Sequence, residues 1–430
     1  MHSENQITFR AIAVWLVCAS FFMYEFMLRT VLGTFQLPIT EDLHLTPVRF
    51  AIISSTAYQI TYGLMQIPVG IIAGRFGLKR TLLFAVLLCA LANFGFSLTH
   101  EFMSAAFFRI LMGLGSSFGF VCLLIAVYDW LPRKNAAFFI GLSQFIGTLG
   151  PMLAAGPVNI LHDANILDWR SLFFSLSMTG LVIAVLVFGV VDKNRHNTGK
   201  FIILNRPSSI KSNLFRLLGQ TQVWFIGLFS ASIYFSIEYL SENEGVLFLQ
   251  NKGFSSGYAS YMITLAWLGY ALSCPLLGYI SDKIQRRKPI MVVCSLVTLV
   301  ALLGIIYLPA NPALTIASFM LLGLGTSGQS LGFAVMAEQC KEEYLAVGLG
   351  LNNAMIMSFA AVSAPVLGTV LSYLEASHPL TLQDLQQTFL LLIPLTLVAL
   401  ICSLFAIKET FCKMRRTNTP LKPQYQSSDI

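Results

Sequence analysis

Long apolar stretches separated by short polar connections dominate the chain. A helix that crosses the roughly 30 Å hydrocarbon layer of a bilayer needs about 20 mostly apolar residues. Cutting the 430-residue chain wherever charged and turn residues cluster leaves twelve such stretches. They cover residues 11–35, 48–73, 81–99, 104–128, 136–160, 170–191, 221–248, 257–280, 289–308, 313–337, 345–373 and 387–407. The pattern predicts an all-α integral membrane protein with twelve transmembrane helices.

Composition agrees with a membrane location and excludes several classes of protein. The chain is 56% hydrophobic and only 11% charged. The formal net charge is +7. In so apolar a chain, an excess of basic residues more often orients membrane helices than binds nucleic acid, so we expect no nucleic-acid partner. The eight cysteines form no CxxC pair and lie mostly in apolar stretches, so neither a disulfide framework nor a metal site is predicted.

The distribution of basic residues predicts the orientation of the helices. With the N-terminus in the cytoplasm, 22 of the 27 Lys and Arg residues lie on the cytoplasmic side, 3 lie on the opposite side, and Arg29 and Arg109 lie within spans. Basic residues concentrate on the cytoplasmic side of membrane proteins. We therefore expect both termini in the cytoplasm.

An internal repeat divides the chain into two halves. The segment GIIAGRFGLKR at 70–80 resembles GYISDKIQRRK at 278–288, and LMGLGSS at 111–117 reappears as LLGLGTS at 321–327. A third pair, AGP at 155–157 and SAP at 363–365, keeps nearly the same offset. Such parallel repeats are typical of transporters built from two related bundles. The predicted domains are a six-helix bundle at 1–191, a cytoplasmic linker at 192–220, a second six-helix bundle at 221–411 and a cytoplasmic tail at 412–430.

These features resemble the major facilitator superfamily over about residues 10–410. The loop after the second helix carries the superfamily's glycine and basic pattern, except that Gly74 occupies its acidic position. The second copy keeps the acid. The resemblance implies that both loops act as cytoplasmic gates through charge contacts, with an altered contact where the acid is missing. The gating residues are Gly70, Arg75, Gly77, Lys79, Arg80, Gly278, Asp282 and Lys283.

Two further resemblances concern function. Arg109 with Gly113 looks like the fourth-helix motif whose interior arginine is linked to proton coupling in the superfamily. The runs YEFMLR at 24–29, YGLMQIPVG at 62–70 and FRILMGLG at 108–115 look like the phagosomal-transporter branch of intracellular bacteria. Members of that branch import amino acids or nucleosides, so the resemblance implies a substrate of this kind.

Ionisable side chains inside spans are costly unless they face a cavity or find a partner, which makes them candidates for function. Glu25 and Arg29 lie one helical turn apart on the same side of the first span. They form either a structural ion pair or a site in which Arg29 binds an anionic group while Glu25 takes an amine or a proton. Arg109 either faces inward and takes part in proton coupling or extends to lipid phosphates.

Glu238 lies at a similar depth in the seventh span. An offset of 213 places Glu25 on Glu238 and Arg29 on Glu242, so the two halves offer related carboxylates. One hypothesis makes Glu238 a proton-coupling group. We expect Glu242 and Glu244 to form a polar collar in external water. The alternative for Glu238 is that it belongs to the same collar.

Other polar side chains within spans are candidates for the substrate site. An amide is unfavourable at a position that faces lipid, so these groups contact either a ligand or a neighbouring helix. For the aromatic residues, packing or a place at the membrane interface is the alternative. The candidates are Tyr58, Gln59, Tyr62, Gln66, Gln144, Tyr234, Trp267, Tyr270, Gln329, Asn352 and Asn353.

The chain contains no GxxxxGK[ST], HExxH or nucleophile-elbow motif, so we expect neither an ATP-driven pump nor an enzyme. The predicted function is gradient-driven transport in the bacterial inner membrane: a monomer, without a cofactor, that imports a small polar solute together with protons. One alternative keeps the fold but carries a siderophore or other polycarboxylate clamped by Arg29 and Arg109. A remote alternative is a membrane sensor that does not transport.

Overall fold

The computed structural model describes residues 7–132, 136–192, 207–340 and 345–413. Helices form nearly all of this part of the chain, and no strand occurs in it. The predicted linker at 192–220 and tail at 412–430 fall partly outside the described residues. Their boundaries therefore stay predictions.

The helices of the first half begin with a long span that changes type near its outer end. The half comprises α1 (Phe9–Thr30), η1 (Val31–Phe35), α2 (Gln36–Asp42), α3 (Pro47–Ala51), η2 (Ile52–Thr56), α4 (Ala57–Phe76), α5 (Leu78–Ser97), α6 (Phe102–Ser116), α7 (Gly119–Trp130), α8 (Ala136–Ala154), α9 (Gly156–Asp163) and α10 (Trp169–Val190). A short helix, α12 (Pro207–Leu218), precedes the second half.

The second half repeats the order of the first. It comprises α13 (Thr221–Glu242), α14 (Gly245–Asn251), α15 (Ser256–Ile284), α16 (Lys288–Tyr307), α17 (Pro312–Thr326), α18 (Gln329–Gln339), α19 (Leu345–Glu375), α20 (Leu382–Phe389), α21 (Leu392–Ile401) and η5 (Cys402–Ala406). The breaks between α6 and α7 and between α17 and α18 fall at the ends of the repeated segments 111–117 and 321–327. The repeat in the sequence is therefore a repeat in the structure.

Eleven segments of the described chain are long and apolar enough to cross a membrane. The twelfth predicted span is the continuous helical run from α3 through η2 to α4, which carries more polar side chains than the others. The turn η2 within it is π-helical, a local widening that leaves main-chain carbonyl groups available to other partners. The fold is the predicted one of twelve spans in two bundles.

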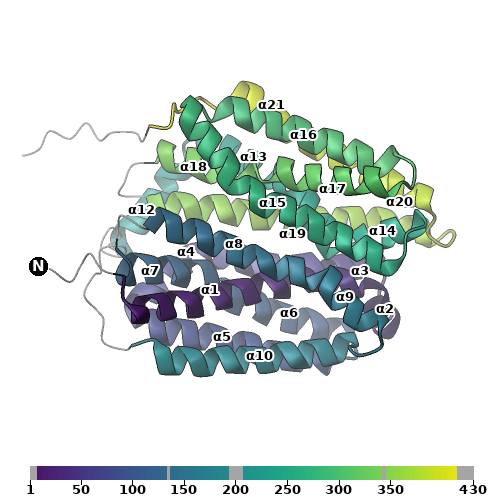
Figure 1. The fold of residues 1–430 in the computed structure, drawn as a ribbon, viewed down its shortest axis with the longest axis horizontal. Coiled ribbons are helices and arrows are strands. Elements are labelled where there is room, and N and C mark those ends of the chain that lie inside the picture. Colours follow the sequence, from purple (N-terminus) through teal and green to yellow (C-terminus); the bar gives the residue numbers. More distant parts are fainter. Residues whose placement is uncertain (1–6, 133–135, 193–206, 341–344, 414–430) are drawn as a thin grey trace, which may run out of the picture.

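The two bundles lie side by side with their helices roughly parallel to the long axis of the molecule (Figure 1). Contacts between them concentrate on α19, which packs against α3, η2 and α4, and on α15, which packs against α8 and α9. The end that carries α2, α9, α14 and α20 is the external end, because the basic connections gather at the other.

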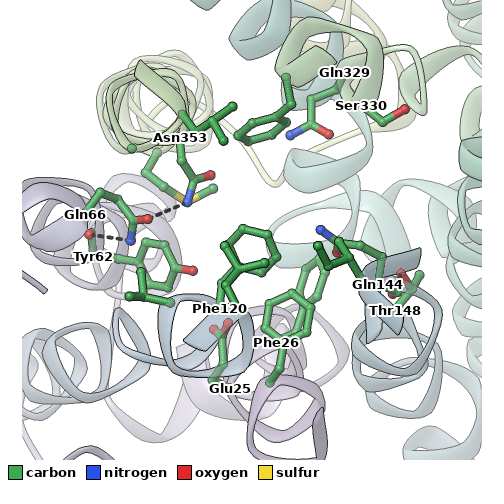
Figure 2. A pocket seen from close by; sticks show the side chains of 18 of the residues that line it. Glu25, Phe26, Tyr62, Gln66, Phe120, Gln144, Thr148, Gln329, Ser330 and Asn353 are labelled. Carbon is green, nitrogen blue, oxygen red and sulfur yellow. Dashed lines mark hydrogen bonds between the residues drawn. The ribbon is translucent and has the colours of Figure 1, made fainter. Parts of the chain in front are cut away.

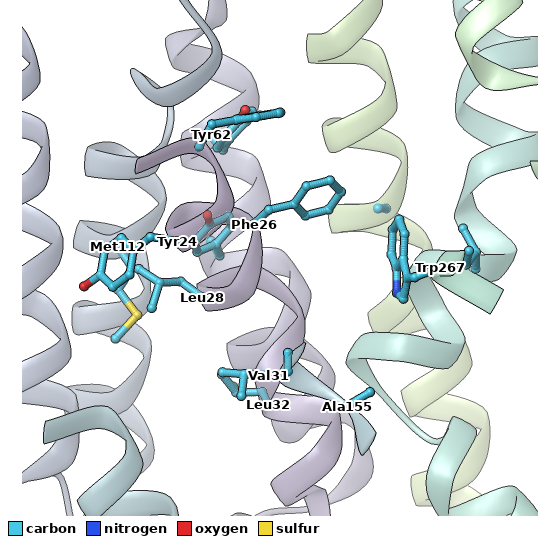
Figure 3. Packing of buried hydrophobic residues seen from close by; sticks show 14 of the residues in the cluster. Tyr24, Phe26, Leu28, Val31, Leu32, Tyr62, Met112, Ala155 and Trp267 are labelled. Atoms are coloured by element: carbon cyan, nitrogen blue, oxygen red, sulfur yellow. The ribbon is translucent and has the colours of Figure 1, made fainter. Parts of the chain in front are cut away.

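Aromatic side chains pack between the bundles near the middle of the molecule. Phe26 of α1 projects toward Trp267 of α15, with ring centroids 5.2 Å apart in an edge-to-face arrangement (Figure 3). Trp267 is fully buried, and its indole N–H donates a hydrogen bond of 2.8 Å to Ser241 Oγ. These contacts cover the external end of the space that separates the bundles.

Candidate functional site

A cavity of about 800 Å³ lies between the two bundles and is lined by residues of both. Its walls run from Arg29, near the outer end of α1, and Tyr234, near the middle of α13, to Gly70 and Leu345 in the cytoplasmic parts of α4 and α19. On the external side of Arg29 the bundles are joined by direct contacts. The structure therefore represents a conformation whose cavity faces the cytoplasm.

Both polar groups and aromatic rings project into the cavity from its wall (Figure 2). The amide nitrogen of Asn353, on α19, donates a hydrogen bond of 2.9 Å to Gln66 Oε1, on α4. Across the cavity, the hydroxyl group of Tyr270 donates to Gln329 Oε1 at 2.8 Å. A pocket with a few converging polar groups on a mainly apolar wall is the usual form of a small-molecule site.

Arg29 connects the two halves at the end of the cavity. Its Nη2 donates a hydrogen bond of 2.6 Å to the hydroxyl group of Tyr234. Its Nη1 lies 3.5 Å from Glu238 Oε1, and its Nε lies 3.3 Å from Glu242 Oε1. A single guanidinium group of the first half is therefore shared by two carboxylates of the second.

Glu25 lines the cavity but does not pair directly with Arg29, whose ion pairs in the described chain are with Glu238 and Glu242. Its carboxylate accepts a hydrogen bond of 3.2 Å from the hydroxyl group of Tyr58. Its side chain lies against Gly119, at the start of α7, where a Cβ atom would come within 2.9 Å of Glu25 Cγ. Because Gly119 has no side chain, there is room for the carboxylate of Glu25.

The expectation that Glu242 and Glu244 lie in external water is wrong, because both are almost completely buried. Glu242 accepts hydrogen bonds from Gln59 Nε2 at 2.7 Å and from Ser55 Oγ at 3.1 Å. The cause is the closed external end, where α13 packs against the first half instead of ending in solvent. The collar alternative is equally wrong for Glu238, which is 1% exposed.

Arg109 lies outside the cavity and does not extend to lipid. The side chain is completely buried, and its three nitrogens donate hydrogen bonds of 2.8 Å to the carbonyl groups of Leu28, Ile53 and Ser54. Two of these carbonyls belong to the π-helical turn η2. Arg109 therefore holds the turn whose Ser54 and Ser55 hydroxyls bind Asn243 and Glu242 of the second half.

The structure separates the candidate polar residues into two groups. The residues that line the cavity are Tyr62, Gln66, Gln144, Tyr234, Tyr270, Gln329 and Asn353. The other group is buried among helices and comprises Tyr58, Gln59, Trp267 and Asn352. Of the two adjacent asparagines of α19 that were candidates, Asn353 therefore faces the cavity and Asn352 faces neighbouring helices. Sequence reasoning left out Thr148 and Ser330, because small hydroxyl side chains are common in packed membrane helices.

The predicted gating loops lie at the cytoplasmic ends of α4 and α15, and they differ in their contacts. In the first, Lys79 Nζ donates to the carbonyl group of Phe188 at 2.5 Å. In the second, Arg287 lies 2.7 Å from Asp282 Oδ1 and 2.8 Å from Glu338 Oε1. An ion-pair cluster forms in the copy that retains the acid.

A sequence profile of the Major Facilitator Superfamily matches residues 16–243 and 244–424, so it covers both bundles. The chain belongs to this superfamily. It is therefore a secondary transporter of a small molecule and not an enzyme, and it is a multi-pass protein of the bacterial inner membrane.

The chain is similar to transporters that are named for different substrates. The chain is 24% identical to the hexuronate transporter of Bacillus subtilis, over 78% of this chain and 80% of the relative. It is 24% identical to the hexose-6-phosphate:phosphate antiporter of Salmonella typhimurium, over 65% of each chain. A crystal structure of a D-xylose-proton symporter superimposes with a TM-score of 0.73 at 16% identity, covering 94% of this chain and 99% of the other. This last likeness establishes the fold alone.

Proposed function

We propose that the protein is a proton-coupled importer of a small polar solute, such as an amino acid or a nucleoside, and that it works as a monomer by alternating access. The observation that carries the proposal is the buried Arg29, shared by Glu238 and Glu242 across the two halves. The group lies at the closed end of a cavity that reaches the cytoplasm. It therefore connects the substrate site with the contacts that hold the external end shut.

The charge balance of this group supports a role for protons. One guanidinium group compensates one carboxylate, and a second buried carboxylate is costly unless it binds a proton or another cation. Glu238 is the better proton carrier of the two, since neither of its oxygens accepts a hydrogen bond within the described chain. Glu242, by contrast, is held by Gln59 and Ser55.

Substrate binding and protonation are linked through Arg29. An anionic group of a substrate competes with Glu238 for the guanidinium, and it succeeds more readily when Glu238 is protonated. Separation of Arg29 from the second half in turn weakens the closed external end. The protein that holds both a solute and a proton therefore changes between the inward-facing and outward-facing conformations more readily than the protein that holds only one of them.

The polycarboxylate alternative is not favoured by the geometry. It requires two arginines at the substrate, but Arg109 donates to three main-chain carbonyls and lies outside the cavity. The D-xylose-proton symporter, whose name states coupling to protons, shares this fold.

The test is uptake by the purified protein in liposomes under an imposed proton gradient. Labelled amino acids and nucleosides are screened first, with and without a protonophore. For a transported solute, E238Q is expected to retain exchange of internal for external solute but to lose accumulation against a gradient. R29A is expected to lose both, and E101Q, at an exposed carboxylate on the external side, neither.

Two results would contradict the proposal. Accumulation that is the same with and without the protonophore would remove the coupling to protons. Full transport by R29A would remove the arginine from the mechanism.

A further inference from the structure

Charge is unevenly divided between the two helices that are related by the internal repeat. Helix α1 carries Glu25 and Arg29, whereas the equivalent positions of α13 carry Glu238 and Glu242. All four residues are at most 5% exposed. Three of the four central positions are therefore acidic, and the position related to the arginine by symmetry is itself a glutamate.

The available cations are already occupied by other groups. Arg29 is paired with Glu238 and Glu242, and Arg109, which interacts electrostatically with Glu242, donates to three carbonyl groups. Glu25 makes no ion pair within 4.0 Å in the part of the chain that the structure describes, although Arg29 attracts it electrostatically; its hydrogen-bond donors are the neutral hydroxyl groups of Tyr58 and Tyr62. The cavity thus contains a buried carboxyl group that has no cation of its own at ion-pair distance among the described residues.

Aromatic rings lie beside this carboxylate. Phe26, Phe120 and Tyr62 line the same end of the cavity as Glu25 (Figure 2). A carboxylate flanked by aromatic faces is a favourable environment for an ammonium group, through a charge-assisted hydrogen bond and cation–π attraction.

We propose that the transported solute carries a protonated amine and no net negative charge, and that Glu25 with the rings of Phe26, Phe120 and Tyr62 is the amine subsite. This inference rests on the proposed function, and it names the substrate class for the same cavity. It also predicts that sugar acids and sugar phosphates, which the named relatives carry, are rejected.

The rejection of anions follows from the described cavity wall. Arg29 is the one Lys or Arg among the described lining residues. A carboxylate or phosphate that entered would leave Glu25 uncompensated and would compete with two glutamates for a single guanidinium. Burial of an uncompensated charge is unfavourable in a medium of low dielectric. A zwitterion avoids this difficulty, because its amine neutralises Glu25 while its carboxylate replaces Glu238.

The experiment measures thermal unfolding of the purified full-length protein in detergent with matched compounds. Each amino acid is compared with its N-acetyl derivative, which lacks the cation, and with its carboxamide, which lacks the anion. Glucosamine, glucose, glucuronate and glucose 6-phosphate form a second series on one ring. A ligand that binds the folded protein raises the unfolding temperature. We expect stabilisation by amine-bearing compounds, loss of it on N-acetylation, and none from glucuronate or glucose 6-phosphate.

Two variants test the subsite itself. E25Q removes the charge and keeps the shape, and we expect affinity for the stabilising amine to fall at least about tenfold. G119A keeps the charge but displaces the carboxylate, since a Cβ there would meet Glu25 Cγ at 2.9 Å, and a similar loss is expected. E101Q is the matched control and should bind like the unmodified protein.

Several results would overturn the proposal: stabilisation by glucuronate or glucose 6-phosphate, equal stabilisation by the N-acetyl derivatives, unchanged affinity in E25Q, or stabilisation by no amine in the series. The proposed function fails separately. A bound amine without gradient-driven uptake would refute proton coupling but leave the amine subsite intact. Gradient-driven uptake of a neutral nucleoside, without binding of any amine, would refute the amine subsite but leave proton coupling intact.

Discussion

The cytoplasmic loops at 70–80 and 278–288 derive from the same repeated motif but are held by different interactions. The first turns at Gly77, with φ 78° and ψ 162°, and is held by a hydrogen bond from Lys79 to a main-chain carbonyl. The second turns at Gln285, with φ 54° and ψ 34°, and is held by ion pairs around Arg287. The two loops differ at the acidic position of the motif, which is occupied by Gly74 in the first copy and by Asp282 in the second.

The comparison shows that a gate motif need not be used equally in both halves. In the second half, Arg287 joins the end of α15 to Glu338 of α18, while Glu409 accepts hydrogen bonds from the first main-chain N–H groups of α16. Three helices and the segment after η5 are thereby fixed to one another. In the first half, the described contacts of Lys79 reach α10 alone.

The largest expected effect is the loss of the cluster in the second loop. R287Q leaves Glu338 buried without its cation, and we expect a loss of about 3 kcal/mol in stability, since removal of one partner strands the other. The measurement is the midpoint of denaturant unfolding. R286Q, at an exposed neighbouring arginine, is the control. Equal midpoints for the two variants would show that the cluster does not stabilise the second half.

The turn of the first loop is the next most sensitive point. The backbone angles of Gly77 belong to a region that is almost restricted to glycine. G77A is therefore expected to cost about 2 kcal/mol of stability. The reciprocal change, Q285G, places glycine at a left-handed position of the second loop and should not destabilise it comparably. A neutral G77A would mean that this turn relaxes freely.

A pH dependence distinguishes the second loop from the first. Burial alone would raise the pKa of Glu409, but hydrogen bonds from four main-chain N–H groups outweigh burial and hold the pKa below its ordinary value. A lowered pKa in the folded state contributes stability above the ordinary pKa and loses it as the pH falls. E409Q should cost about 1 kcal/mol near neutral pH and reduce the loss of stability on acidification below about pH 4.5. An unchanged acid profile would contradict this account.

The smallest effect is expected for the lysine of the first loop. K79Q removes an exposed hydrogen bond to a carbonyl group, which we expect to be worth about 0.5 kcal/mol. K283Q, at the aligned region of the second loop, serves as the comparison. An effect of K79Q as large as that of R287Q would remove the distinction between the two loops.

The fold was predictable because apolar length and basic connections directly reflect the bilayer. The π-helical turn at Ile52–Thr56 was not, since it depends on Arg109, which comes from a different helix and binds carbonyl groups rather than side chains. No local sequence pattern specifies such a contact.

The substrate cavity was only partly predictable. Successive helical residues differ by about 100° in direction, so the choice between Asn352 and Asn353 requires the rotation of α19, which sequence spacing alone does not supply. Glu242 illustrates a different difficulty. Its burial belongs to a conformation in which the external end is closed. One sequence encodes several conformations, and a position that lies in water in one can be buried in another.

The contact of Ser54, Ser55 and Gln59 with Glu242 and Asn243 has a consequence for temperature dependence. Water can replace each of these hydrogen bonds when the bundles part, so little apolar surface becomes hydrated at this point. Hydration of apolar surface raises the heat capacity and that of polar surface lowers it. Separation at this contact should therefore contribute a small or negative heat-capacity change. Its contribution to the free-energy difference between the conformations should then vary almost linearly with temperature.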